Sequence, residues 1–153
     1  FMGREPIKGF GPFKTFDIEK ANSIAAERMG QIGIDIRDPS QAVGTMSGGE
    51  RQCLAISRAI YFGAKVLILD EPTSALDLSI QSQIIDLLKK LQKENNLGYI
   101  FISHDLRVIQ SLAHQLIVLK NGKIVESGSS DQIFKKPKQK YTKQLISAAF
   151  EIK

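Results

Sequence analysis

The sequence predicts an α/β fold, and three features carry this prediction. Residues 66–69 are consecutive apolar residues that end in the adjacent carboxylates of Asp70 and Glu71, a pattern typical of a buried parallel strand. The small residues 47–49 open an amphipathic segment, which predicts a helix with free backbone N–H groups at its start. Helical and strand patterns alternate along the rest of the chain. Ligands of such folds bind at the carboxyl edge of the sheet, where we expect Asp70 and Glu71.

The first part of the chain is expected to be mainly helical. Residues 1–16 are rich in Gly, Pro and Phe without periodicity, which predicts an irregular lead-in. Asp17 can cap a helix over about 18–29, where apolar residues recur at helical spacing. A loop over 30–45 then leads to a second helix over 47–62.

The second part is expected to alternate strands and helices. Asn121-Gly122 is a strong signal for a two-residue hairpin turn between two of these strands. The expected elements are a strand at 65–70, a helix at 78–95, a strand at 98–103, a short helix after Asp105, strands at 115–120 and 123–127, and helices at 130–135 and 141–149.

Length and composition favour a single domain of a cytoplasmic protein. A compact chain of 153 residues can bury one core. The single cysteine, Cys53, excludes an internal disulfide, and no apolar leader is present, so a reducing compartment is expected. No apolar stretch approaches the roughly 20 residues of a membrane-spanning helix. A role at a membrane would therefore need partner subunits.

The net charge of +5 is localised and does not predict a nucleic-acid partner. Five lysines within residues 135–143 account for the whole excess, and no acidic residue lies among them. A short basic run is more often a solvated surface than a nucleic-acid patch, so no nucleic acid is expected. Phe1 precedes Met2, so we expect the chain to begin inside a longer protein.

A phosphate-binding loop of the Gly-Lys-Ser/Thr type is absent from these 153 residues. Residues 9–11 contain two glycines without the following Lys-Ser/Thr, and Gly122-Lys123 is followed by Ile124. The chain is therefore expected to hold only half of a nucleotide site.

Four motifs in order give the chain a specific resemblance. Residues 47–49 match the signature motif, Asp70-Glu71 the end of the Walker B strand, residues 74–77 the D-loop and His104 the switch histidine of the ABC ATPases. Each motif alone is common, but their order and spacing are specific. The whole chain thus resembles the second half of an ABC transporter nucleotide-binding subunit. The resemblance implies a partial P-loop NTPase fold that lacks the Walker A strand and loop.

The resemblance also implies a division into three parts. Residues 1–62 would belong to the helical subdomain with the signature motif, residues 63–128 to the RecA-like core, and residues 129–153 to C-terminal helices. Departures from the family pattern are modest. Met46 stands where Leu is usual, Glu50 where Gln is frequent, and Cys53 at a position that is often basic.

The family chemistry is then expected on particular residues. Asp70 would hold Mg²⁺, and Glu71 would polarise the water that attacks the terminal phosphate of ATP. His104 would contact that phosphate and link Glu71 to the opposing D-loop. The residues expected to bind nucleotide are Ser47, Gly48, Gly49, Glu50 and Asp77. Of these, the signature residues 47–49 would contact the ATP held by the other subunit of a head-to-tail dimer.

The implied protein is an importer subunit that couples ATP hydrolysis to the uptake of a sugar or a short peptide. Its expected partners are a second nucleotide-binding subunit and membrane permeases, at the inner face of the membrane. Without a phosphate loop the isolated chain is expected to be inactive, and its missing central strand leaves open sheet edges that favour self-association.

The subfamily signals divide along the chain. Residues 2–6 and 63–70 resemble sugar importers, whereas residues 78–83 and 101–106 resemble oligopeptide and dipeptide importers. This predicts a mosaic with a join in or near residues 67–77, and a natural hybrid importer is the alternative.

Other ABC classes and a non-catalytic role are the alternatives to an importer subunit. DNA-repair ATPases carry long heptad arms that 153 residues cannot hold. Translation-associated relatives generally show Asn-His where this chain has Ser74-Ala75. The remaining alternative is a non-catalytic fragment or engineered chimera that keeps the motifs without turnover.

Overall fold

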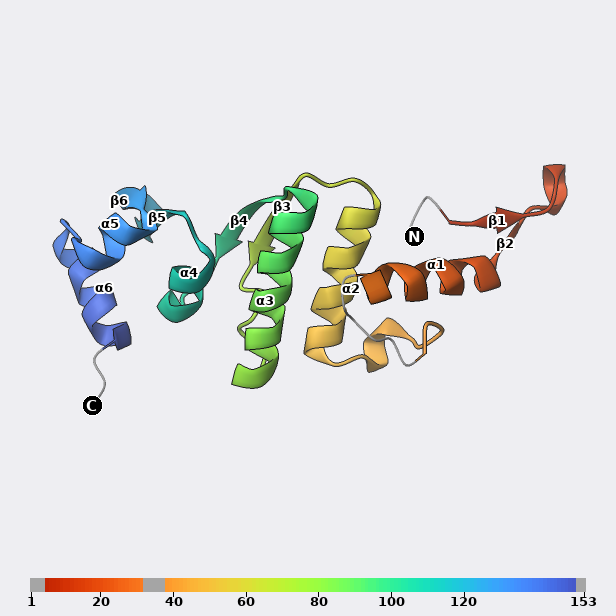
Figure 1. The fold of residues 1–153 in the computed structure, drawn as a ribbon, viewed down its shortest axis with the longest axis horizontal. Coiled ribbons are helices and arrows are strands. Elements are labelled where there is room, and N and C mark those ends of the chain that lie inside the picture. Colours follow the sequence, from red (N-terminus) through yellow and green to blue (C-terminus); the bar gives the residue numbers. More distant parts are fainter. Residues whose placement is uncertain (1–4, 32–37, 151–153) are drawn as a thin grey trace. The chain divides into compact units, whose positions relative to one another are not determined.

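The computed structural model describes residues 5–31 and 38–150, which mix helices and strands as predicted (Figure 1). The chain divides into two compact units. Unit 1 comprises residues 1–67 and 75–100, and unit 2 comprises residues 68–74 and 101–153. The chain passes from one unit to the other at three places: within strand β3 (Val66–Asp70), between residues 74 and 75, and within strand β4 (Gly98–Ile102).

Unit 1 begins with a small hairpin where an irregular segment was predicted. Strands β1 (Ile7–Lys8) and β2 (Thr15–Phe16) pair antiparallel, and the 3₁₀ turn η1 (Gly11–Phe13) lies between them. Gly9 adopts φ of 97°, a left-handed conformation that glycine tolerates best. Two pairs of residues are too few to leave a periodic pattern, which is why the sequence did not reveal this hairpin.

Three helices build the core of unit 1. Helix α1 (Ile18–Gln31) packs against α2 (Gly48–Tyr61), and α2 packs against α3 (Leu78–Asn95); the 3₁₀ turn η2 (Val43–Thr45) precedes α2. Part of the predicted loop, residues 32–37, lies outside the described residues. The buried apolar side chains contributed by the three helices are Ala21, Met29, Cys53, Ile56, Ile84, Ile85, Leu88 and Leu91.

Strands β3 and β4 pair as a two-stranded sheet and run in the same direction. At their start the Gly98 N–H donates to the Lys65 carbonyl at 2.8 Å, and at their end the Glu71 N–H donates to the Ile102 carbonyl at 2.9 Å. The residues that follow the two strands therefore meet at one edge, as expected of parallel strands.

The expectation that β3 is buried on both faces is wrong. Leu67 and Leu69 are buried, whereas Val66 and Ile68 on the other face are 58% and 70% exposed. Buried and exposed side chains alternate along β3 because no element among the described residues covers its second face. A continuous apolar run alone does not say whether both faces have a partner.

Unit 2 is built on a β-hairpin and three short helices. Helix α4 (Leu106–Leu112) is followed by β5 (Gln115–Lys120) and β6 (Lys123–Ser129), which pair antiparallel. The turn residues Asn121 and Gly122 have φ of 50° and 73°, as the predicted tight turn requires. Helices α5 (Ser130–Lys135) and α6 (Lys140–Phe150) complete the unit, and α6 packs on α4 and β6.

The described strands form three separate two-stranded sheets, β1–β2, β3–β4 and β5–β6. The open edges expected of the sheet could also have led the strands at 98–103 and 115–120 to pair with each other. Within the described part of the chain this pairing is not present, because β4 is not hydrogen-bonded to β5. Within residues 5–31 and 38–150, no helix is both long and apolar enough to cross a bilayer.

Candidate functional site

The carboxyl ends of β3 and β4 bring two of the predicted catalytic residues into direct contact in unit 2. His104 Nδ1 lies 2.7 Å from Glu71 Oε1, although 33 residues separate the two in the chain. The His104 backbone N–H donates to the same carboxylate oxygen at 3.1 Å. The pair is open to solvent, because the side chains of His104 and Glu71 are 78% and 35% exposed.

The backbone of Glu71 is held in an unusual conformation. Its φ of 46° lies in the left-handed region, which is uncommon for a residue with a Cβ atom. Hydrogen bonds on both sides maintain it: the N–H donates to Ile102, and the carbonyl accepts the Ser74 hydroxyl at 3.0 Å. Backbone strain of this kind clusters at functional sites, and here it orients the carboxylate toward the end of β4.

Ser103 is a member of this site that the sequence analysis did not single out. Its hydroxyl lies 3.5 Å from Glu71 Oε2 and accepts the Asp105 N–H at 3.1 Å. Asp105 in turn caps α4 by accepting the Arg107 N–H at 2.9 Å. The only available signal was the position of Ser103 immediately after an apolar strand and before His104.

The charge of Glu71 stabilises the protonated imidazole of His104. The hydrogen bond that the His104 ring donates to Glu71, the negative charge of Glu71 and, more weakly, the charge of Asp105 raise the pKa of His104 above its ordinary value. A raised histidine pKa means that this contact stabilises the folded chain at low pH and that the contribution is lost as pH rises through the folded-state pKa. The Glu71 carboxylate therefore favours the protonated form of the His104 ring.

We expect NMR titration to show this coupling directly. In the native chain the imidazole of His104 should titrate above the ordinary histidine range, and in Glu71→Gln its pKa should fall because the negative charge is gone. The chain has two histidines, so a His114→Gln variant assigns the signals and serves as the control. An unchanged His104 titration in Glu71→Gln would contradict the contact.

The predicted signature residues lie in unit 1 and form a capping box at the start of α2. The Ser47 hydroxyl accepts the Glu50 N–H at 3.3 Å, and the Glu50 carboxylate accepts the Ser47 N–H at 2.7 Å. Glu50 therefore has a structural partner that the sequence analysis did not foresee. This box fixes the helix start, where backbone N–H groups can receive a phosphate.

The two signature glycines lie close to neighbouring side chains, and the contact is tighter at Gly49. A Cβ atom at Gly48 would lie 3.0 Å from the Leu76 side chain, and one at Gly49 would lie 2.7 Å from the Ile80 side chain. The start of α2 thus packs directly on the predicted D-loop and the first turn of α3. A larger residue at 49 would fit only if the Ile80 side chain or the helix that carries it shifted.

The remaining predicted binding residues are placed at the ends of elements. Asp77 caps α3: its carboxylate accepts the Ile80 N–H at 2.9 Å and the Ser79 hydroxyl at 3.0 Å, and these bonds lower its pKa. Asp70 is the last residue of β3, exposed and directly before Glu71. Cys53 is buried, and burial raises the pKa of its thiol to about 11, as suits a packed thiol without a catalytic task.

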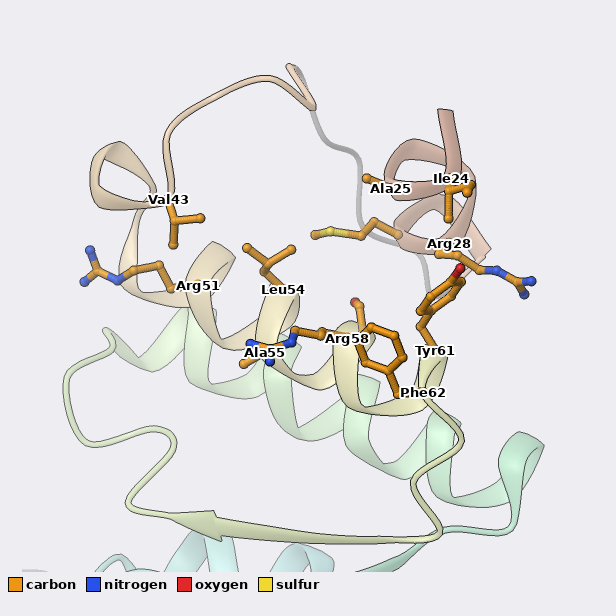
Figure 2. Close-up of a pocket in the computed structure, with 12 residues that line it drawn as sticks. Ile24, Ala25, Arg28, Val43, Arg51, Leu54, Ala55, Arg58, Tyr61 and Phe62 are labelled. Carbon is orange, nitrogen blue, oxygen red and sulfur yellow. The ribbon is translucent and has the colours of Figure 1, made fainter. Parts of the chain in front are cut away.

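A separate cavity of about 510 Å³ lies between α1 and α2 in unit 1 (Figure 2). Apolar side chains such as Ile24 and Leu54 line it together with the arginines 28, 51 and 58, and none of the predicted site residues does so. Among the described residues that line it, none is a carboxylate, a histidine or a cysteine.

Comparison with known proteins gives consistent matches. A family model described as "ABC transporter" matches residues 11–74. A peptidoglycan transport ATP-binding protein, YejF, of Agrobacterium fabrum is 45% identical over 91% of this chain and 26% of its own length. An oligopeptide transport ATP-binding protein, OppD, of Mycobacterium tuberculosis is 42% identical over 94% of this chain and 23% of its own length. The chain thus spans about a quarter of these relatives.

Solved structures show the same fold. An inward-facing putative metal-chelate type ABC transporter matches with a TM-score of 0.65 and 26% identity, over 94% of this chain and 54% of its own. The dimeric bacterial cassette MJ0796 matches with a TM-score of 0.62 and 28% identity, over 80% of this chain and 51% of its own. A second structure of that cassette, bound to ADP and Pi, matches with the same TM-score.

Proposed function

Because the chain belongs to the ABC transporter ATP-binding family, we propose that it is the C-terminal half of a nucleotide-binding unit that powers peptide import. The observation that carries the proposal is the contact of Glu71 with His104 at the carboxyl ends of β3 and β4. In this assignment residues 1–62 belong to the helical subdomain, residues 63–128 to the RecA-like core and residues 129–153 to the C-terminal helices.

Each residue of the pair has a distinct role in the proposed hydrolysis. Glu71 orients the attacking water and accepts its proton, since a carboxylate within hydrogen-bond reach of water can act as a general base. His104 holds Glu71 in place and, when protonated, presents positive charge to the terminal phosphate. Ser103 supports the second carboxylate oxygen of Glu71 and limits its rotation.

The donor set at the end of β3 suits Mg²⁺. The described part of the chain has no cluster of three or more His, Cys, Asp and Glu side chains able to hold a metal ion. Mg²⁺ does not need one, because it commonly takes one or two carboxylates and completes its shell with water and phosphate oxygens. Asp70 is the residue that would hold it, and the bound ion would offset the negative charge of the phosphates.

The rest of the nucleotide site is proposed to come from outside these residues. The phosphate loop would be supplied by another part of the polypeptide or by a second chain. The start of α2 would face nucleotide on a second cassette in a head-to-tail dimer, since its capping box leaves an ordered helix terminus. Permease subunits would hold this dimer at the cytoplasmic face of the membrane.

The peptide class is favoured over a mosaic origin. The match to the oligopeptide transport relative covers 94% of this chain, so it extends to both sides of the predicted join at residues 67–77. This extent supports a single peptide-importer origin. The second candidate function is a non-catalytic fragment or engineered chimera. A measurement of ATP hydrolysis distinguishes it from the first candidate.

Activity of the chain alone and of a completed cassette tests the proposal. We expect no Mg·ATP binding by calorimetry and no turnover for the isolated chain, because Glu71 and His104 lack a phosphate loop to act against. Fusion to the N-terminal half of the M. tuberculosis OppD cassette should restore turnover. Hydrolysis by the isolated chain would reveal a phosphate site that we have not recognised. A folded fusion that binds ATP without turnover would favour the non-catalytic candidate.

A further inference from the structure

Unit 2 carries a concentrated basic surface that the proposed hydrolysis does not use. Residues 106–150 contain eight basic residues and only two acidic ones. We call its lysines the lysine surface, and all of them are exposed: Lys120, Lys123, Lys135, Lys136, Lys138, Lys140 and Lys143.

Specific contacts gather these lysines from separate elements. Lys120 and Lys123 are cross-strand partners at the end of the β5–β6 hairpin. Lys120 Nζ lies 4.5 Å from the centre of the Tyr141 ring in the first turn of α6, which joins the hairpin to the lysine run. The segment before α6 is tied to β6, because the Glu126 carboxylate accepts the Lys138 N–H at 2.8 Å.

Neither acidic residue of this region neutralises the surface as a whole. Glu126 directs its two carboxylate oxygens to the backbone N–H groups of Lys138 and Gln139. Asp131 pairs with Lys135, its neighbour one turn along α5, at 2.9 Å. Both carboxylates of residues 106–150 thus already have partners, and neither forms an ion pair with the side chain of another lysine of the surface.

We propose that the lysine surface docks on an anionic membrane surface and holds unit 2 against the phospholipid headgroups. The choice of a membrane rests on the proposed function, which places the chain beside membrane subunits. The chemistry also favours it, because the region 115–150 contains no arginine and its positive charges are all carried by lysine side chains. Lysines suit diffuse attraction to lipid phosphates, whereas nucleic-acid recognition relies heavily on the planar arginine fork.

Vesicle co-sedimentation of the full chain tests this docking. We expect binding to vesicles that contain phosphatidylglycerol, no comparable binding to pure phosphatidylcholine, and weaker binding at higher salt. Each lysine near an anionic surface contributes roughly fivefold to the affinity. The triple variant Lys136→Gln, Lys138→Gln, Lys140→Gln should thus bind roughly 100-fold more weakly. The Lys138 backbone contact with Glu126 does not involve the side chain, and all three positions are exposed, so the fold should persist.

A matched triple variant shows whether vesicle binding depends on the position of the lysines or only on the net charge of the chain. Lys89→Gln, Lys90→Gln and Lys93→Gln on α3 remove the same charge from exposed positions outside the lysine surface, and should leave vesicle binding close to the native value. Equal loss in both triple variants, absence of binding by the native chain, or tighter binding to a short DNA duplex at the same salt would each overturn the proposal. The vesicles carry no nucleotide, so these outcomes leave the proposed hydrolysis untouched.

Discussion

Replacing Glu71 by Gln in the completed cassette should abolish most ATP hydrolysis while ATP binding persists. The amide keeps the size of the carboxylate and can still accept a hydrogen bond from His104, but it cannot take a proton from water. Loss of a general base typically lowers the rate by roughly 10² to 10⁴-fold. Phosphate release measures turnover, and retention of labelled ATP on the purified dimer measures binding.

The matched control for this experiment is Glu94→Gln. Glu94 lies exposed near the end of α3 and undergoes the same chemical change, so its turnover should equal that of the native cassette. His104→Ala should also reduce turnover by removing the partner of Glu71. If Glu71→Gln kept near-normal turnover, Glu71 would not be the base and the assigned mechanism would have to be abandoned.

Replacing Leu88 by Ala should destabilise the folded chain by about 2–5 kcal/mol. Leu88 has no exposed surface and lies in the middle of α3, so the substitution leaves a cavity that surrounding side chains fill only in part. Urea denaturation followed by circular dichroism measures the change. The midpoint should move to a lower urea concentration, because less free energy separates the folded and unfolded states.

The same helix supplies the control. Leu78 is 81% exposed at the first position of α3, and Leu78→Ala should change the free energy of unfolding by less than about 0.5 kcal/mol. Equal effects of the two substitutions would mean that Leu88 does not belong to a packed core in solution.

Most helices and strands could be predicted because their signals are local. The helix start at Ser47 was predicted from neighbouring residues alone, and Asn121-Gly122 adopts the positive φ angles of its predicted turn. The strand predicted at 65–70 from consecutive apolar residues is likewise observed, as β3 (Val66–Asp70). The hairpin of β1 and β2 was not predicted, since it depends on two residue pairs and the freedom of Gly9.

The sequence predicted which residues belong to the candidate site better than it predicted how they are arranged. The sequence by itself determined that two carboxylates end β3 and that a histidine follows β4, because each of these is a matter of neighbouring residues. The tertiary structure alone decided that Glu71 and His104 touch, that Ser103 joins them, and that one face of β3 lies exposed. Those facts depend on the parallel pairing of two strands about thirty residues apart and on which strand faces other elements cover. Neither can be read from the pattern of neighbouring residues.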